Sequence, residues 1–274
     1  MSRIWLNIEG LGRAITGNLE YTFRIFLMVY LSFRAAFLDH TQGLRTILSV
    51  LSTQIYFTGW QAMPLITILA LASGGILIIQ GMTNLTLLGG NEMIGNLLVL
   101  VLVREIGPLL TALVVIARSG TAVSTEVGNM RANREIEALE SIGINPLSFI
   151  VFPRILGGVI SVLCLAFYFI VISILGGFLI TRFIHDIPFS FYSESVLRAF
   201  AKEDVFIFLL KNSFSGMIIF VVSCYQGLSV KKSPHEVPQV TTQAVVKSII
   251  YVTVFNMSVT AIVYLNQLKK IGVF

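Results

Sequence analysis

The sequence predicts an all-α integral membrane protein with five transmembrane helices. Membrane-surface helices precede them at the N-terminus, and a short helix outside the membrane joins spans 2 and 3. Composition supports this fold class, because 55% of the 274 residues are hydrophobic and only 12% are charged, whereas soluble domains carry about 25% charged residues. Several apolar runs also approach the roughly 20 residues that a transmembrane helix needs. The chain is therefore expected to fold in a lipid bilayer.

Residues 1–50 form an amphipathic region in which charge recurs too often for an ordinary membrane span. Its arginines are spaced about ten residues apart, at Arg3, Arg13, Arg24, Arg34 and Arg45. Only nine residues separate Arg24 from Arg34, whereas a span needs about 20. We expect one or two helices that lie in the headgroup plane on the cytoplasmic side. The alternative is a tilted span at residues 21–38 whose arginines reach the headgroups.

Residues 51–274 are predicted to form a single membrane domain. Its apolar segments are expected to be transmembrane helices at about residues 60–81, 93–117, 155–184, 205–230 and 245–265. Small residues at positions 73–75 favour the close approach of another helix. Basic residues are more numerous on the side that carries the N-terminus and the loop 118–154. Because basic loops stay in the cytoplasm, we expect a cytoplasmic N-terminus and a periplasmic C-terminus.

The motifs of common enzymes are missing from the sequence. The dipeptide Gly-Lys does not occur, so the chain lacks the phosphate-binding loop of P-loop ATPases. The histidines and cysteines have no metal-ligand spacing. We therefore expect no enzymatic activity, no metal, no cofactor and no nucleic-acid partner. The aspartates and glutamates outside the stretch 104–146 are interpreted as solvated surface residues.

Arg104 and Glu105 place two charges near the middle of the second predicted span. A charge at that depth costs about 2.5–3.5 kcal/mol on insertion scales. Pro108 removes a backbone hydrogen bond and is expected to kink the helix just beyond the two charges. Two interpretations remain open: neighbouring helices satisfy both charges and fix the packing, or Arg104 binds an anionic headgroup that Glu105 helps to orient.

The loop 118–154 is rich in charge and contains a short helical pattern. Asn133 is predicted to be the N-cap, and Gly143 suits the position just past the helix end. The pattern also contains an apolar stripe at helical spacing, formed by Ile136, Leu139 and Ile142. Because this stripe needs burial, we predict an amphipathic helix outside the membrane that docks on a partner, with a partnerless surface helix as the alternative.

The stretch from the two charges through this loop resembles a known family. Its fixed spacings include Arg-Glu-x-Gly-Pro at 104–108, Glu-x-Gly-x-Met-Arg at 126–131, Asn-Pro at 145–146 and Pro-Arg at 153–154. These elements are similar to the signature of the MlaE/YrbE permeases, which are the membrane subunits of ABC-type lipid transporters that work with MCE-domain proteins. The resemblance covers nearly the whole chain in span order.

The resemblance implies partners and site residues. The partners are a second copy of the chain, a cytoplasmic ABC ATPase dimer, and an MCE-domain lipid-binding protein on the outer side, with a small regulatory subunit left open. The phospholipid-binding residues that it implies are Leu77, Leu85, Leu88, Arg104, Glu105 and Ile106. The ATPase-coupling residues that it implies are Glu126, Met130, Arg131, Arg134, Glu137, Leu139 and Glu140.

Three hypotheses for the function follow from the sequence. The leading one is a permease subunit that moves phospholipid between the inner membrane and an MCE-domain partner, driven by a separate ATPase. The second is an ion-coupled transporter with Glu105 as the titrating group, and the third is a membrane scaffold that transports nothing. The expected location is a bacterial inner membrane, with the plastid inner envelope as the alternative.

Overall fold

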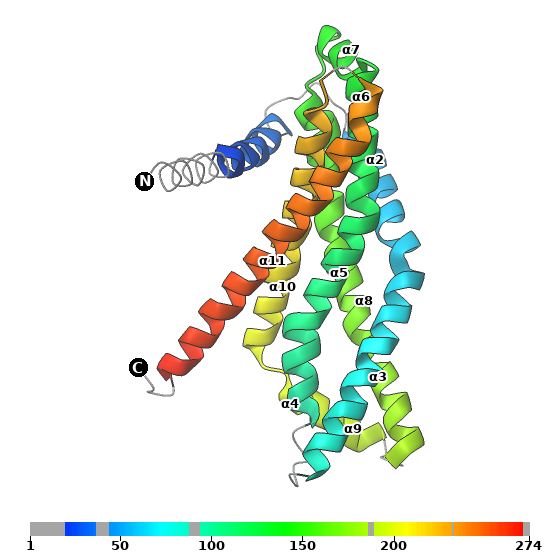
Figure 1. Cartoon of the computed structure of the whole chain (residues 1–274), viewed down its shortest axis with the longest axis vertical. Helices are drawn as coiled ribbons and strands as arrows, with labels where there is room; N and C mark the ends of the chain where they lie inside the picture. The colour runs from blue at the N-terminus through cyan, green and yellow to red at the C-terminus, as the bar shows by residue number, and fades with distance from the viewer. Residues whose placement is uncertain (1–19, 37–43, 88–93, 186–188, 232, 271–274) are drawn as a thin grey trace, which may run out of the picture.

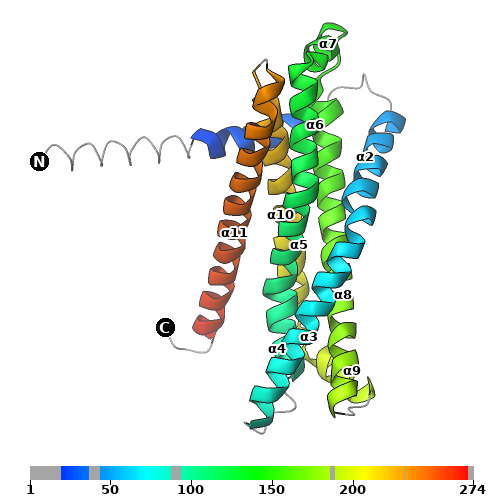
Figure 2. The same cartoon turned by 45° about the vertical axis from the view of Figure 1, so that its right-hand side comes forward.

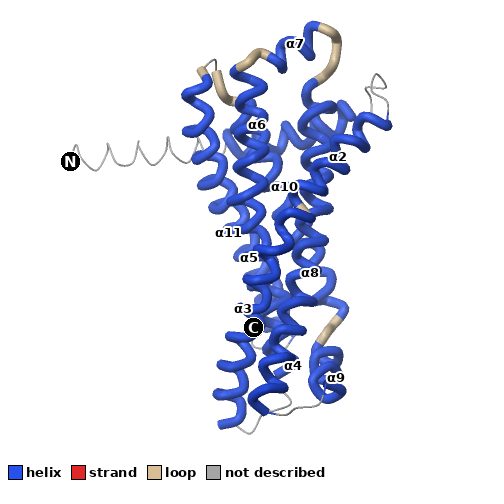
Figure 3. Tube along the Cα trace, turned by 90° about the vertical axis from the view of Figure 1, so that its right-hand side faces the viewer, coloured by secondary structure: helices blue, strands red, loops and turns tan. Residues whose placement is uncertain are grey.

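The computed structural model of the chain describes residues 20–36, 44–87, 94–185, 189–231 and 233–270. These residues form helices joined by short connections, and they contain no strand (Figure 3). The bundle is elongated, with α7 (Glu135–Ser141) at one end and α9 (Phe189–Ala199) at the other (Figure 1). The predicted all-α class is thus confirmed.

The other helices follow one another with few interruptions. In chain order they are α2 (Leu44–Thr58), η1 (Trp60–Ala62), α3 (Met63–Leu87), α4 (Ile94–Leu98), η3 (Val99–Ile106), α5 (Gly107–Val115), η4 (Ile116–Gly120), α6 (Thr121–Ala132), η5 (Leu147–Val151), α8 (Phe152–His185), α10 (Lys202–Leu228), η6 (Pro234–Glu236) and α11 (Val237–Lys270). The segments η3, η4 and η5 are π-helical turns within longer helices.

Five stretches of the described chain are long and apolar enough to cross a membrane, as predicted. They are Leu48–Gly81, Gly95–Ala132, Leu147–Phe183, Lys202–Leu228 and Pro234–Lys269. All five are longer than the apolar segments predicted from the sequence, the fourth by only one residue. The reason is that hydropathy marks the part of a helix inside the hydrocarbon, whereas the helices themselves continue beyond it at one or both ends.

The second span shows how a proline and two charges shape a membrane helix. Pro108 has no N–H, so the carbonyl oxygen of Arg104, four residues earlier, lacks its usual helical donor. A π-helical segment, η3, ends two residues before the proline and contains both Arg104 and Glu105. The sequence predicted a distortion just beyond the two charges. The π-helical distortion instead includes the charges themselves. Wide π turns of this kind often mark functional positions.

Helix α8 lies at the centre of the bundle, where it packs against α2, α3 and α10. Glycines allow these helices to approach closely. A Cβ atom on Gly74 of α3 would lie 2.1 Å from the backbone oxygen of Ser173 in α8, and one on Gly158 of α8 would lie 2.0 Å from the ring of Phe220 in α10. The predicted close approach near residues 73–75 is therefore confirmed at Gly74, in line with the small residues found between membrane helices.

The helix at residues 20–36 runs across the bundle near its α7 end, whereas α11 runs along the outside (Figures 1 and 2). Gln226 of α10 donates a hydrogen bond of 2.8 Å to the Tyr21 hydroxyl, and the Tyr21 ring stacks on the ring of Tyr251 in α11. The crosswise direction suits a membrane-surface helix. Its placement in the headgroup plane stays a prediction, and residues 1–19 lie outside the described part.

Candidate functional site

Arg104 is held by an aspartate from another helix. The Arg104 guanidinium donates through Nε to Oδ1 of Asp204, at the start of α10. The Asp204 side chain is 1% exposed and that of Arg104 is 14% exposed. The other carboxylate oxygen of Asp204 accepts from the backbone N–H of Ala201, which fixes the start of α10. The interpretation of acidic residues outside 104–146 as solvated surface is therefore wrong for Asp204, because burial here is offset by an ion pair and a helix cap.

Glu105 belongs to a second, separate pair. The Lys211 ammonium of α10 lies 3.1 Å from both carboxylate oxygens of Glu105, and the Thr260 hydroxyl of α11 donates to them at 3.0 Å. Lys211 also donates at 2.7 Å to the carbonyl oxygen of Arg104. This is the carbonyl that Pro108 leaves without a helical donor. Lys211 thus neutralises the carboxylate and satisfies the backbone at the same point.

These contacts join three helices through one group of polar side chains, which we call the mid-span network: Arg104, Glu105, Asp204, Lys211 and Thr260. Lys211 is 1% exposed, whereas the Glu105 side chain is 40% exposed. Arg104 and Glu105 therefore each have a charged partner on a neighbouring helix, as the packing interpretation requires. The carboxylate of Glu105 still reaches the surface, so the network is not sealed from a ligand.

The surface beside Glu105 is hollowed. A pocket of about 370 Å³ lies between the second span and α11, where Glu105, Ile106 and Thr260 line it together with Met257. Among the other implied lipid-binding residues, Arg104 is held by Asp204, and Leu77 is half-buried against the main core. The side chain of Leu85 and the whole of Leu88 lie outside the described part. The structure thus brings together Glu105 and Ile106, and it leaves their role in lipid binding as a prediction.

The sequence analysis missed Asp204 and Lys211. Lys211 had a visible signal, since it is a lone cation inside the fourth apolar segment. An intramembrane charge of this kind normally pairs with another charge or with backbone carbonyls. Asp204 had no comparable signal, because it lies in a cluster of charged residues at the edge of that segment.

The predicted helix of the 118–154 loop is present as α7. Gly143 has a left-handed φ of 81°, its N–H donates to the carbonyl of Glu140, and the N–H of Ile144 donates to the carbonyl of Leu139. This is the two-bond Schellman ending, so the predicted role of Gly143 is confirmed. The predicted N-cap is wrong by one residue, because Arg134 occupies that position with φ 60° and no side-chain cap.

The apolar stripe of α7 is partly buried against the bundle and partly exposed. Ile136 is 2% exposed and packs in the core, and Leu139 is half-buried against it. Ile142 is 69% exposed. Most of the stripe therefore holds α7 onto its own bundle, and only Ile142, next to the exposed Glu140, remains for a partner.

Several of the implied coupling residues form ion pairs that brace this end of the bundle. Arg131 of α6 pairs with Glu137 of α7 at 3.0 Å, and Glu126 of α6 pairs with Arg154 of α8 at 2.7 Å. Met130 lies half-buried against the core. Arg134 and Glu140 are exposed. The residues that the resemblance implies for coupling thus comprise a set that ties α6 to α7 and α8, and an exposed set on and beside α7.

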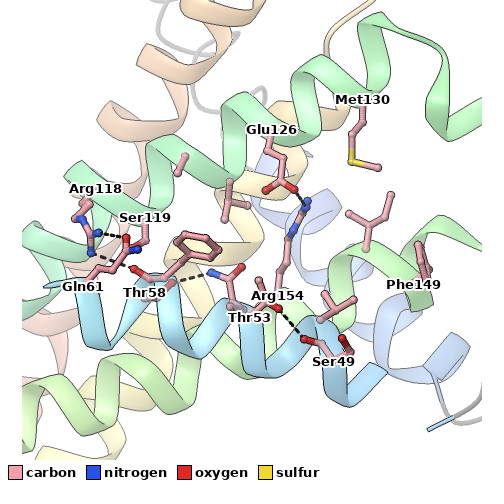
Figure 4. A pocket seen from close by; sticks show the side chains of 16 residues that line it. Ser49, Thr53, Thr58, Gln61, Arg118, Ser119, Glu126, Met130, Phe149 and Arg154 are labelled. Carbon is pink, nitrogen blue, oxygen red and sulfur yellow. Dashed lines mark hydrogen bonds and ion pairs between the residues drawn. The ribbon is translucent and has the colours of Figure 1, made fainter. Parts of the chain in front are cut away.

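A second and larger pocket opens below α7, with a volume of about 680 Å³. Figure 4 shows it between α2 and α6, with the start of α8 as its third wall. At one end of the pocket Arg118 donates to the backbone oxygen of Phe57 at 3.0 Å and to Oε1 of Gln61 at 2.6 Å. This pocket lies nearer the α7 end of the second span than the mid-span network does.

Five membrane-spanning helices, a charge network inside them and a braced helix at one end define a polytopic α-helical membrane protein. The family model described as Permease MlaE matches residues 51–262. The chain therefore belongs to the MlaE family of ABC transporter permeases.

Named relatives agree with this assignment. A probable ABC transporter permease protein of Rickettsia felis is 30% identical over 79% of this chain and 84% of its own length. The intermembrane phospholipid transport system permease protein MlaE of Haemophilus influenzae is 29% identical over 78% of this chain and 83% of its own length. The chloroplastic protein TRIGALACTOSYLDIACYLGLYCEROL 1 of Arabidopsis thaliana is 27% identical over 72% of this chain and 56% of its own length.

Proposed function

We propose that this permease moves phospholipid between the inner membrane and an MCE-domain partner, driven by a separate cytoplasmic ATPase. The observation that carries the proposal is the mid-span network, together with a relative named for intermembrane phospholipid transport. Fixed charges inside a bilayer cost free energy and are usually kept for a substrate pathway. The sequence offers no phosphate-binding loop of its own, so the ATP must be hydrolysed by a partner.

We propose that the phospholipid binds at the surface formed by Glu105 and Ile106. Arg104 and Lys211 hold two positive charges within the bilayer, close to the pocket that Glu105 lines. A phosphate headgroup would be attracted to these cations and would displace the Glu105 carboxylate, because arginine and lysine both bind phosphate well. The acyl chains would lie along the apolar side chains around Ile106. A homodimer would enclose this surface, and an MCE-domain protein would receive the lipid on the outer side.

We propose that α7, through its exposed residues, is the part of the permease that contacts the ATPase. Ile142 and Glu140 are the groups that an ATPase would contact, and the Arg131–Glu137 pair would pass its movement to α6. Helix α6 continues through η4 and α5 to the mid-span network. A change in the ATPase would therefore reach Glu105 along one continuous helix.

A second candidate is an ion-coupled transporter, which the Glu105–Lys211 pair favours because the Glu105 carboxylate lies within the membrane and remains 40% exposed. In that case the driving force would be a proton or cation gradient, and no ATPase would be needed. The two candidates differ in their response to an uncoupler.

Replacing Ile142 by aspartate is expected to reduce copurification of the ATPase at least about fivefold, because an exposed apolar anchor at a docking surface contributes roughly 1–3 kcal/mol. The protein itself should keep its fold, since Ile142 is 69% exposed. The measurement is the ratio of ATPase to permease after affinity purification. Lys231→Glu is the matched control, because Lys231 is exposed in the connection between α10 and η6 and is not part of α7. Equal recovery with both variants contradicts the docking role of α7.

A further inference from the structure

The pocket of about 680 Å³ below α7 is separate from the mid-span network and has a charge of its own. Three ionised side chains line it: Arg118, Arg154 and Glu126. Glu126 pairs with Arg154, and it is 61% exposed. Two guanidinium groups against one carboxylate leave the lining with one net positive charge, which an anion would neutralise.

Arg118 holds the uncompensated charge. Its two described hydrogen bonds end on neutral oxygens, those of Phe57 and Gln61, and no described carboxylate forms an ion pair with it. A guanidinium has five N–H donors, so Arg118 keeps three of them for a ligand. Figure 4 shows its side chain beside Ser119 and Gln61 at one end of the pocket.

Arg154 provides an unsatisfied donor in the opposite part of the pocket. The residue is 7% exposed, and its Nη1 atom is buried without a hydrogen-bond partner. A buried donor without an acceptor costs about 1–3 kcal/mol, and more when it is charged. An anion in the pocket would lower this cost through its charge, because the described counterion of Arg154, Glu126, is 61% exposed and therefore partly screened by water.

The depth of the pocket indicates where its ligand comes from. The first span, Leu48–Gly81, has 34 residues, which is about 50 Å of helix, whereas the hydrocarbon core is about 30 Å thick. The residues of this span that line the pocket all lie between Ser49 and Gln61. Trp60, at the same level, is 63% exposed, as is common for tryptophan at the membrane–water boundary. The pocket therefore lies at the level of the lipid headgroups.

The neighbouring surface suits the rest of a lipid. Phe57 lines the pocket and is 53% exposed. Tyr56 and Leu48 of the same helix are exposed as well. An amphiphile with its phosphate at Arg118 would have Phe57 beside its headgroup, and its acyl chains would pass Trp60 toward the hydrocarbon. A volume of several hundred Å³ is ordinary for small-molecule sites.

We propose that the pocket between α2, α6 and α8 binds the phosphate headgroup of a phospholipid from the leaflet on the α7 side. This site is distinct from the mid-span network. The lipid bound here braces α2 against α6, the helix that leads from α7 to Glu105. The proposal stands apart from the transport function, because it concerns binding alone and is tested without any transport readout.

The test is native mass spectrometry of the purified permease complex, titrated with dihexanoyl phosphatidylglycerol and, separately, with inorganic phosphate. The short-chain lipid is expected to bind the wild type. Arg118→Gln should weaken binding at least about tenfold, since a charge-assisted hydrogen bond contributes roughly 1.5–3 kcal/mol. Ala122→Leu should weaken it similarly by filling the pocket, while it leaves both arginines and their bonds in place. Ala122 is exposed, so this variant is expected to fold.

Arg198→Gln is the matched control, because Arg198 is an exposed arginine on α9 at the far end of the bundle, paired with Glu194. Its affinity for the lipid should equal that of the wild type. Equal binding by Arg118→Gln, Ala122→Leu and this control overturns the proposal. So does inorganic phosphate that binds as tightly as the lipid. If neither probe binds and Arg118→Gln loses the copurified ATPase, the pocket is a protein-docking surface, and the proposal is again overturned.

Discussion

Replacing Asp204 by asparagine is expected to lower the free energy of unfolding by about 3–5 kcal/mol, because it leaves Arg104 as an unpaired charge inside the bundle. Asparagine keeps the shape of the side chain and an oxygen that can still accept from Ala201, so the loss isolates the charge from the helix cap. The measurement is the thermal unfolding midpoint of the detergent-solubilised protein, followed by circular dichroism.

The control and the coupled variant make this prediction specific. Glu194→Gln removes a carboxylate from an exposed pair on α9 and should cost less than about 1 kcal/mol. Arg104→Gln combined with Asp204→Asn should be more stable than the sum of the two single effects predicts, because the second change removes the charge that the first left unpaired. Strictly additive effects would show that Arg104 and Asp204 do not interact.

Replacing Lys211 by methionine is expected to slow lipid transfer at least about tenfold. The substitution removes the ammonium that holds Glu105, so the carboxylate is left with Thr260 alone. It also leaves the Arg104 carbonyl without its donor at the position where Pro108 cannot supply one, which costs about 1–3 kcal/mol. Both changes loosen the second span at the point where we place the cargo.

The measurement for Lys211→Met is the rate of ATP-dependent transfer of a fluorescent phospholipid by the reconstituted complex. Lys202→Met is the matched control, because Lys202 lies on the same helix and is exposed. Wild-type transfer by Lys211→Met, at equal protein recovery, would mean that the mid-span network has no part in transport.

Local patterns in the sequence predicted much of this fold. Hydropathy located all five spans, and the spacing around Gly143 predicted the end of α7, because apolar length and a left-handed glycine each depend on a few neighbouring residues. The N-cap prediction failed because Arg134 adopts φ 60°. Asn133 is the better N-cap by preference, but it continues the end of α6, where its N–H donates to Asn129.

The partners of the intramembrane charges could not be predicted in the same way. Arg104 and Asp204 are 100 residues apart in the chain, and Glu105 and Lys211 are 106 apart. Their pairing depends on how α10 packs against the second span, which no local pattern encodes. The role of Lys211 at the Arg104 carbonyl follows from Pro108, but only the packed structure supplies the donor.

The central claim is that this permease moves phospholipid with energy from a partner ATPase, through a surface that Glu105 lines. The most direct test reconstitutes the chain with its copurified ATPase in liposomes that contain a fluorescent phospholipid, and follows transfer with and without ATP and with a proton uncoupler. The account predicts transfer that requires ATP and the ATPase and is insensitive to the uncoupler. Transfer that persists without the ATPase and collapses with the uncoupler would contradict it, as would a complex that moves no lipid under any of these conditions.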